Sequence, residues 1–508
     1  MSNLFIGWSE ANITPDKKVS LYGQFYERIS EYIEKPLTAT VFAVECENDQ
    51  MILCSADLVG ISYNLKDAIK EKLSGNTEGI DPEKIIICAT HVHTGPAYTF
   101  KEQQSKYFAG ESVDVLKKYL RPGQKYIPLA NTQNADVATE EEVFELLTES
   151  ISDAILEAWR TRRPGKFVNG FERAVVGLCR RSVYSDGTGQ MWGDTNTAVF
   201  SDLEGGSDSG VELLYAFDDE NNLTGVISNL SCTAQCVQHR NFVSPDFWGE
   251  AKKLVREYFK NEKLYLLPLC APAGDQCPID LVRWVNPETD VHDPNIIRHN
   301  PPVRKADPSM FDLSGMRKAG KRVARAIIDA YEEGLSDFQE DVPFKHQVHV
   351  FQLPLRRTTL SEYNNAVERI NDYLDKHPGD VTYMDTANLH TYLGIAKRFI
   401  VQEKMETVEA EVHIVRLGSV CFATNPFELF LKYGNQIRSR QLCEQSFLIQ
   451  LANGMEGYLP SEAAEKHGHY SGAIGSGQAG HEAGDLLVRD TLKFMNQLFE
   501  DDYEVYRY

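Results

Sequence analysis

The stretch that decides the fold of this chain is Ile85-Ile86-Ile87-Cys88-Ala89-Thr90-His91-Val92-His93-Thr94-Gly95-Pro96. Its β-branched run predicts a buried strand, and Gly-Pro predicts that the strand stops just after the histidines. Because residues i and i+2 of an extended strand lie on one face, His91 and His93 are expected to converge at the strand's mouth. Neutral imidazole is a common metal ligand, so the pattern favours a metal or catalytic site. Two histidines that are hydrogen-bonded in a loop are the alternative.

Outward from this stretch, strands and helices alternate. Residues 37–60 read as a hairpin of two apolar strands, and a helix is expected from about 64 to 73, before the histidine strand. Further helices are expected at 141–160, 315–333, 360–376 and 484–499, and further strands within 167–230, 264–269, 345–355 and 409–424. The pattern predicts a mixed α/β (α+β) fold in which layered mixed sheets are flanked by helices.

The domain organisation is expected to be simple. We find no internal repeat and no clear linker, which favours one composite domain over residues 1–508. Residues 98–140 are polar and poorly periodic, and are expected to form a lid or insertion near the histidines. Residues 283–312 are expected to form an irregular, proline-rich excursion.

The composition bounds the partners and the compartment. A formal net charge of −22 argues against nucleic acid and anionic membranes, which need basic surfaces, so the expected partner is a small-molecule substrate. No apolar run is long enough to span a membrane, and no secretory signal is visible. The ten cysteines show no regular framework and predict reduced thiols in a cytoplasmic protein. Whether the chain forms a homo-oligomer is left open.

Several other strand-like runs end in residues that carry chemistry. These residues are Asp57, Cys232, His239, Asp246, Asp275, Glu428, Tyr458 and Tyr470. Each also has a purely structural interpretation. Asp57 would cap a helix, and Asp275 would close its glycine turn. Glu428 would be a negative charge at a helix N-terminus, where the helix dipole favours it. Tyr458 would be a packed aromatic residue, and His239 an exposed loop residue. Their shared position at strand ends favours one common site.

The order of short motifs resembles the catalytic domain of the neutral/alkaline (non-lysosomal) ceramidases. The likeness runs from Gly7 to about Val488, and Thr90-His91-Val92-His93-Thr94-Gly95-Pro96 is its most specific element. The other elements are Asn12-Ile13-Thr14-Pro15, Ser55-Ala56-Asp57-Leu58, Gly274-Asp275-Gln276, Pro426-Phe427-Glu428 and Gly457-Tyr458-Leu459-Pro460. The resemblance implies a zinc-dependent hydrolase of ceramidase-like fold whose Zn²⁺ ligands include His91, Glu428 and Tyr458.

The chain departs from that family at two points. Where the family has its second histidine ligand, this chain has Cys232-Thr233, so either Cys232 or His239 would supply the remaining ligand, or the site would be incomplete. Where the ceramidases have a serine nucleophile, the chain reads Ala271-Pro272-Ala273. The sequence therefore predicts a divergent relative that lacks the nucleophile and acts on another substrate, with a small polar amide or ester as the leading class.

Roles follow for the remaining candidates. His93 is expected to shuttle a proton or to donate to an oxyanion, and Asp275, with Asp57 as a further catalytic candidate, to orient water or substrate. The substrate-binding candidates are Arg180, Arg181, Trp248, Tyr470 and Asp246.

Two other functions stay open. The first is a glycosidase with a carboxylate pair drawn from Asp57, Asp246, Asp275 and Glu428, for which Trp192, Trp248, Tyr458 and Tyr470 would suit sugar stacking. The second is a non-catalytic binding protein on the same fold.

Overall fold

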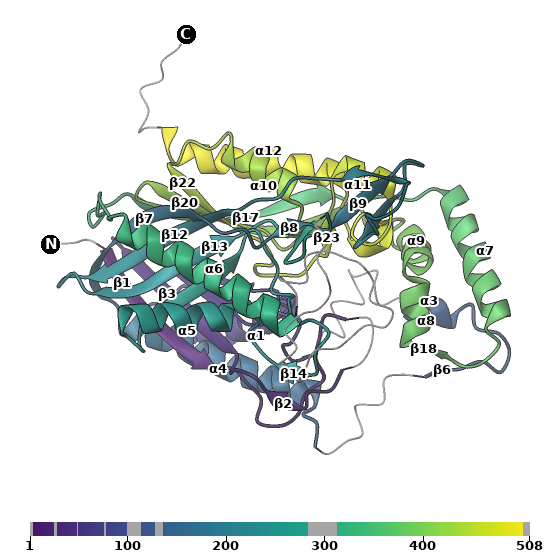
Figure 1. Ribbon diagram of the computed structural model, residues 1–508, viewed down its shortest axis with the longest axis horizontal. Coiled ribbons are helices and arrows are strands. Elements are labelled where there is room, and N and C mark those ends of the chain that lie inside the picture. The colour runs from purple at the N-terminus through teal and green to yellow at the C-terminus, as the bar shows by residue number, and fades with distance from the viewer. Residues whose placement is uncertain are drawn as a thin grey trace, which may run out of the picture.

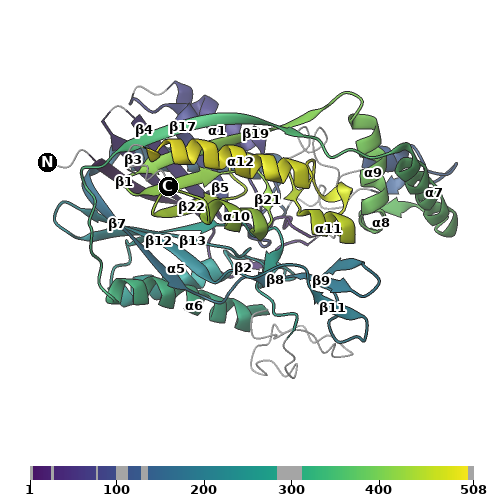
Figure 2. The same ribbon diagram turned by 90° about the horizontal axis from the view of Figure 1, so that it is seen from above.

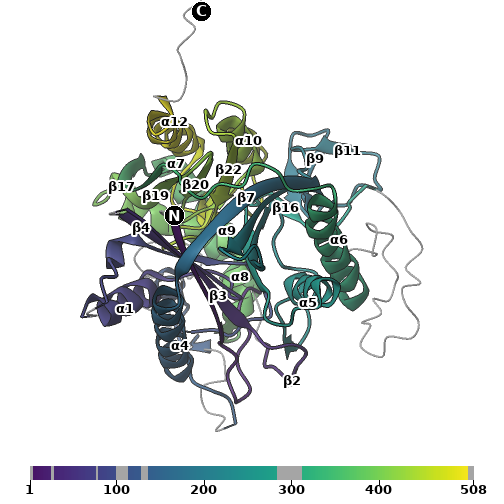
Figure 3. The same cartoon turned by 90° about the vertical axis from the view of Figure 1, so that its left-hand side faces the viewer.

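The computed structural model shows four layers, in which helices enclose two stacked β-sheets (Figure 1). It describes residues 4–24, 28–47, 49–75, 78–98, 113–127, 136–282 and 312–500. The end-on view shows α1, α4, α5 and α6 on one side of the stack and α10 and α12 on the other (Figure 3). The mixed α/β fold of layered sheets flanked by helices, predicted from sequence, is confirmed.

The larger sheet has eight strands in the order β15-β13-β12-β7-β1-β3-β4-β5. Most neighbouring strands are antiparallel, but β5 runs parallel to β4, and β15 runs parallel to β13. The bounds are β1 (Leu4–Asn12), β3 (Thr38–Cys46), β4 (Asp49–Ala56), β5 (Ile85–Ala89), β7 (Arg163–Arg173), β12 (Gly210–Asp218), β13 (Leu223–Leu230) and β15 (Tyr265–Cys270).

The second sheet has four strands in the order β17-β19-β20-β22, with β20 and β22 parallel. Its strands are β17 (Phe344–Pro354), β19 (Thr407–Leu417), β20 (Val420–Thr424) and β22 (Gln445–Ile449). Residues of both sheets share one apolar core, in which Phe42 and Ile86 of the larger sheet join Phe422 and Phe447 of the second. Because both faces of these strands are buried, their sequences read as nearly continuous apolar runs.

The flanking helices bury the outer faces of the sheets. Helices α1 (Tyr63–Ser74) and α4 (Glu140–Arg160) cover one half of the larger sheet, α5 (Phe247–Phe259) and α6 (Asp312–Glu332) cover the other half, and α10 (Leu431–Arg438) and α12 (His481–Gln497) cover the second sheet. Helix α4 begins at a capping box in which Thr139 and Glu142 satisfy each other's backbone N–H groups. The apolar residues Val143, Leu147 and Ile151 then recur at helical spacing toward the core.

A smaller group of helices lies at one end of the molecule (Figure 2). It consists of α3 (Val113–Lys117), α7 (Leu360–Lys376), α8 (Tyr383–Asn388) and α9 (His390–Val401), and α3, α7 and α9 share a satellite core. Part of the expected lid, residues 113–127, packs here, whereas residues 99–112 and 128–135 lie outside the described residues. The expected excursion at 283–312 also lies outside them, except for Asp312, which begins α6.

The remaining elements are short and lie mostly near the strand ends. They are β2 (Tyr32–Ile33), β6 (Tyr126–Ile127), β8 (Leu178–Cys179), β9 (Arg181–Tyr184), β10 (Gly189–Met191), β11 (Phe200–Leu203), β14 (Phe242–Val243), β16 (Gln276–Cys277), β18 (Val381–Thr382), β21 (Glu428–Leu429), β23 (Tyr458–Leu459), α11 (Glu462–His467) and the 3₁₀ turns η1 (Pro82–Lys84) and η4 (Ile474–Ser476).

The carboxyl ends of five strands meet at one place. Backbone hydrogen bonds join Ala89 to Leu451, Ala271 to Leu230, Gln450 to Cys270 and Asn425 to Ile449, and thereby link the ends of β5, β13, β15, β20 and β22. The loops that follow these strands therefore share one neighbourhood, as expected from their polar sequences.

Two further expectations can be compared with the structure. Among the described residues, none of the helices is both long and apolar enough to cross a membrane. All ten cysteines are buried and unbridged, as predicted.

Candidate functional site

The two histidines of the opening motif meet, but not by the predicted route. Strand β5 ends at Ala89, and His91 has a φ of +60°, a left-handed conformation that residues other than glycine seldom adopt. The prediction that both side chains share one face of an extended strand is therefore wrong. The turn after the strand brings the rings together instead, with 3.2 Å between His91 Nε2 and His93 Nε2. Such backbone strain in a buried residue is typical of functional sites.

The hydrogen bonds of the two rings fix where their protons lie. His91 Nδ1 is 2.7 Å from the carbonyl oxygen of Val59, which can only accept, so this nitrogen carries the proton. His93 Nε2 is 2.9 Å from the side-chain nitrogen of Gln235, which donates to it. The Nε2 atoms of the two rings therefore lie side by side. Burial, together with His91 and Arg28 nearby, holds the pKa of His93 well below its ordinary value and keeps the ring neutral.

Glu428 brings a third electron-rich atom to the same point. It lies in β21, parallel to and directly opposite Tyr458 in β23, and its Oε2 is 3.4 Å from His91 Nε2. This oxygen is buried and accepts no hydrogen bond. Burial alone would raise the pKa of Glu428, but His91 and Arg180 outweigh that effect and hold it below the ordinary value. The carboxylate is therefore ionised beside the His91 ring.

Close backbone approach makes room for this carboxylate. A Cβ atom added to Gly274 would lie 2.3 Å from the carbonyl oxygen of Glu428, so only glycine fits there. The glycine of the Gly-Asp pair thus positions the segment that carries Glu428.

Arg180 and Tyr458 form the other wall of the cluster. Arg180 Nη2 donates to the Tyr458 hydroxyl at 3.1 Å and to the Gly274 carbonyl at 2.9 Å, while Nη1 donates to Gln235 at 3.3 Å. Burial alone would lower the pKa of Arg180, but Tyr458 and Glu428 raise it above the ordinary value, so the guanidinium stays charged. Burial, with Glu428 beside it, raises the pKa of Tyr458, so the phenol is neutral.

Gln235 is a functional residue that the sequence interpretation missed. It bridges His93 and Arg180, and its Oε1 also accepts from the Thr233 hydroxyl at 2.5 Å. Because a guanidinium can only donate, the Gln235 oxygen must face Arg180, and the Gln235 nitrogen must face His93. Its position in the loop after β13, between two cysteines, was the available signal. A neutral amide carries no charge that would have singled it out.

Three predicted carboxylates accept structural hydrogen bonds instead. Asp57 accepts from the backbone and hydroxyl of Thr38, each at 2.9 Å. Asp275 accepts from Leu431 N at 2.9 Å, at the start of α10. Asp246, with a φ of +54°, accepts from Phe247 N and Val237 N and so caps α5 and holds the loop of Gln235. Burial raises the pKa of Asp246 to about 6.

The predicted substrate-binding residues separate into two groups. Tyr470 joins the cluster, its ring 5.3 Å from that of Tyr458 in an edge-on arrangement. Arg181 instead forms an ion pair with Glu204 and donates to the Tyr470 and Gly468 carbonyls. Trp248 is fully buried in the core between α5 and the sheet.

The two candidates for the remaining ligand lie in different surroundings. His239 Nε2 is 3.7 Å from the Asp312 carboxylate, near the start of α6. Cys232 is fully buried, and its Sγ is 3.4 Å from the carbonyl oxygen of Thr233. Burial raises the pKa of the Cys232 thiol well above its ordinary value, which disfavours the thiolate form that binds metals.

Two atoms beside the His91 ring have the spacing of zinc ligands. Within the described ranges, no three histidine, cysteine, aspartate or glutamate side chains are arranged to hold a metal, so the phenol of Tyr458 would have to complete a set of three. Two ligands of a tetrahedral zinc lie about 3.3 Å apart, close to the 3.4 Å between His91 Nε2 and Glu428 Oε2. The unpartnered Glu428 oxygen and the backbone-held His91 ring both fit that ligand chemistry.

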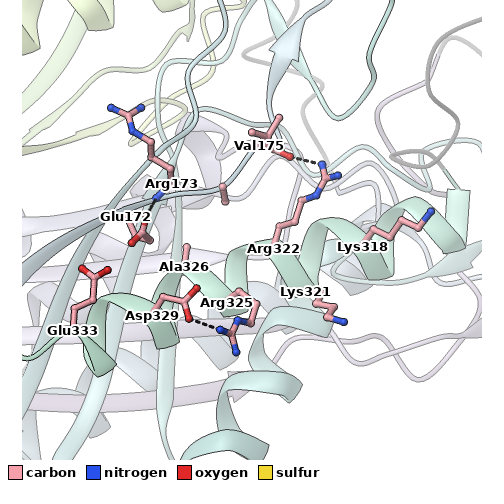
Figure 4. A pocket seen from close by; sticks show the side chains of 11 residues that line it. Glu172, Arg173, Val175, Lys318, Lys321, Arg322, Arg325, Ala326, Asp329 and Glu333 are labelled. Atoms are coloured by element: carbon pink, nitrogen blue, oxygen red, sulfur yellow. Dashed lines mark hydrogen bonds and ion pairs between the residues drawn. The ribbon is translucent and has the colours of Figure 1, made fainter. Parts of the chain in front are cut away.

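A surface groove offers no comparable chemistry. It has a volume of about 630 Å³ and lies between α6 and the end of β7 (Figure 4). Cations such as Lys318 and Lys321 alternate there with the acidic Glu172, Asp329 and Glu333. The groove shares no residue with the cluster around His91.

Comparison with known proteins identifies the fold. No family model and no curated protein sequence matches the chain. The crystal structure of neutral ceramidase from Pseudomonas aeruginosa matches 99% of this chain and 75% of its own, at a TM-score of 0.67 and 16% identity. A structure described as ceramidase complexed with C2 matches 100% of this chain and 77% of its own, at a TM-score of 0.65 and 15% identity. The chain therefore has a neutral ceramidase-like fold.

Proposed function

We propose that this chain is a zinc-dependent hydrolase that cleaves an amide bond in a small polar substrate other than ceramide. The observation that carries the proposal is that His91 Nε2 lies 3.2 Å from His93 Nε2 and 3.4 Å from Glu428 Oε2 in a buried place. Atoms of this kind repel one another unless a proton or a metal cation lies between them. The ceramidase-like fold supports the hydrolase class and the amide bond.

His91, Glu428 and Tyr458 would hold the zinc. Bound there, zinc would polarise an amide carbonyl and lower the pKa of water toward neutrality. The Arg180 guanidinium, fixed beside Tyr458, would stabilise negative charge that develops on the carbonyl oxygen. Neutral His93 would accept a proton at Nε2 and pass it to the leaving nitrogen.

The substrate is proposed to differ from ceramide because the positions that the resemblance assigns to the nucleophile carry no hydroxyl group. Ala271-Pro272-Ala273 precedes Gly274-Asp275, and Pro272 packs against Gly434. Water is then the proposed nucleophile. A small polar amide as substrate would leave room for this water in the site. Ten unbridged thiols support a reducing compartment such as the cytoplasm.

The glycosidase alternative has less support. A glycosidase needs two carboxyl groups that flank the scissile bond. Of the four candidates, Asp57, Asp246 and Asp275 accept backbone hydrogen bonds, which leaves Glu428 as the carboxylate directed at the histidines. The binding-protein alternative has no specific observation in its favour.

Metal analysis combined with a substrate panel tests the proposal. The purified protein should contain about one zinc per chain and should hydrolyse N-acyl amides in preference to esters and glycosides, with activity lost on chelation and restored by zinc. His91→Ala should lose zinc and activity together. Glu428→Gln should lose at least about 100-fold in kcat/KM while retaining a cooperative unfolding transition.

Matched variants make the test specific. His377→Ala removes an exposed imidazole and should change neither zinc content nor activity. His239→Ala and Cys232→Ser ask which of the two, if either, supplies a further ligand. Activity that survives complete chelation would contradict the metal role. Ligand-induced stabilisation without hydrolysis of any member of the panel would favour the binding protein.

A further inference from the structure

Two neighbouring arginines, both almost fully buried, differ in whether a carboxylate balances their charge. Arg181 is paired with the Glu204 carboxylate, and three further oxygen atoms accept from it. Arg180, with 1% of its surface exposed, has no hydrogen-bonded carboxylate among the residues that the structure describes; its hydrogen-bond acceptors are an amide, a carbonyl and a phenol. A buried charge without a counter-ion is costly, so Arg180 stands out as a place for an anion.

Arg180 also retains hydrogen-bonding capacity. A guanidinium has five N–H groups, and three are used, on Gln235, Gly274 and Tyr458. Its Nε is buried without any acceptor. One N–H of Nη1 is likewise not used by these bonds. A buried donor without an acceptor is destabilising unless a ligand supplies one.

The nearby carboxylates do not fill this role. Glu428 Oε2 is directed at His91 and lies 3.4 Å from its Nε2. Asp275 is occupied by Leu431 N at the start of α10, and Asp246 by Val237 N and Phe247 N. Among the described residues, no carboxylate is hydrogen-bonded to Arg180, and a ligand anion would balance its charge.

We propose that the substrate is an amide with a carboxylate close to the scissile bond, as in an N-acyl amino acid, and that the unused N–H groups of Arg180 bind this carboxylate. The proposal rests on the proposed function, since it places the anion beside Tyr458 and Glu428. In the reaction, the bond between the acyl carbon and nitrogen breaks, and the oxygen of one water adds to that carbon. The nitrogen gains a proton, so a carboxylic acid and a free amino acid are released.

Matched ligands test the proposal. N-Acylglycines with acetyl, butyryl and octanoyl chains would be compared with the corresponding N-acylglycinamides, which replace only the carboxylate. We expect the acid of at least one pair to bind at least 10-fold more tightly by calorimetry and to be hydrolysed with the higher kcat/KM. Arg180→Met should bring the ratio of the two affinities close to unity through weaker binding of the acid, and should lower kcat for acid and glycinamide alike, since it also removes the donor to the carbonyl oxygen. Equal affinity for acid and amide, or binding of neither, would overturn the proposal.

A second pair of variants guards against misfolding of Arg180→Met. Gln235→Glu would place an internal carboxylate next to Arg180, because Oε1 of Gln235 is 3.3 Å from Nη1. It should bring the preference for acids close to unity, whereas Gln235→Leu, which adds no charge, should leave most of it. A preference that persists in Gln235→Glu would contradict the role of Arg180.

The two proposals can fail separately. Tight binding of the acids without hydrolysis would reject the proposed hydrolase but retain the anion site. Hydrolysis of acids and glycinamides at equal rates would retain the hydrolase and reject the anion site.

Discussion

Glu456 is a buried carboxyl group outside the cluster around His91. Its Oε1 accepts from the Tyr63 hydroxyl at 2.5 Å, and its Oε2 has no hydrogen-bond partner. Burial raises its pKa from 4.5 to about 7, against a smaller opposing effect of the Tyr63 hydrogen bond. The folded protein therefore holds this proton more tightly than the unfolded chain does.

Glu456 should make stability depend on pH. Its contribution is fully present below about pH 4.5 and is lost as the pH rises through about 7. Glu456→Gln keeps an acceptor for Tyr63 but cannot ionise. Its free energy of unfolding should exceed that of the wild type by up to about 3 kcal/mol above pH 7. Urea titrations at several pH values measure this, and the exposed Glu71→Gln is the control. Parallel pH profiles for wild type and Glu456→Gln would contradict it.

At this scale, the sequence predicted side chains that carry charge or bind metals. His91, His93, Glu428, Tyr458 and Arg180 were all candidates, and they meet in one place. Two things could not be predicted. The left-handed turn at His91 depends on tertiary contacts, since its ring is held by the distant Val59 carbonyl. Arg180 and Arg181 differ in their partners because Glu204 pairs with Arg181, and this contact forms only in the folded chain.

Among the elements, the strand that leads into the two histidines is held at its outer edge by a loop. Strand β5 is the last strand of the larger sheet, and Asn453 lies along its open side. The Asn453 side chain accepts from Ile87 N at 2.7 Å and donates to Ile85 O at 3.0 Å, and its own backbone N donates to Ile87 O. Asn453 thus takes the place of a neighbouring strand, with a φ of +53° that asparagine tolerates.

Asn453→Ala should loosen this edge. The substitution leaves buried backbone groups of Ile85 and Ile87 without partners and also removes contacts to Glu411 and His413. We expect the free energy of unfolding to fall by about 2 to 4 kcal/mol, measured by urea denaturation. Asn388→Ala, which loses one exposed hydrogen bond to Tyr373, is the control and should change it by less than about 0.5 kcal/mol. A similar small change in both variants would contradict the role of Asn453.

Periodicity predicted the elements well where one face is buried. The helix expected at 360–376 is α7 with the same bounds, and those at 141–160 and 484–499 are α4 and α12 within a few residues. The order in which the strands pair could not be predicted from the same patterns. β7 lies between β1 and β12, far from both in sequence, because sheet order depends on long-range packing that local patterns do not encode.

At the scale of the whole molecule, the candidate site joins the two sheets. His91 and His93 follow a strand of the larger sheet, whereas Glu428 and Tyr458 follow strands of the second. The sequence predicted layered sheets, and the motif order predicted the ceramidase-like fold that the structural comparison bears out. It could not predict that the two sheets would each supply half of one site, since this requires the shared core between them.

A metal shared between the sheets should stabilise the molecule as a whole. Binding to the folded state alone adds RT ln(1 + [L]/Kd), about 2.7 kcal/mol at a free zinc concentration 100 times the Kd. For a single unfolding transition of all 508 residues, this would correspond to a rise in Tm of about 2 to 3 °C. Calorimetry in a zinc buffer should show this rise for the wild type and none for His91→Ala. Because ten cysteines in the unfolded chain compete for zinc, only the difference between the two proteins is diagnostic. An equal response in both would mean that zinc does not bind at the junction of the sheets.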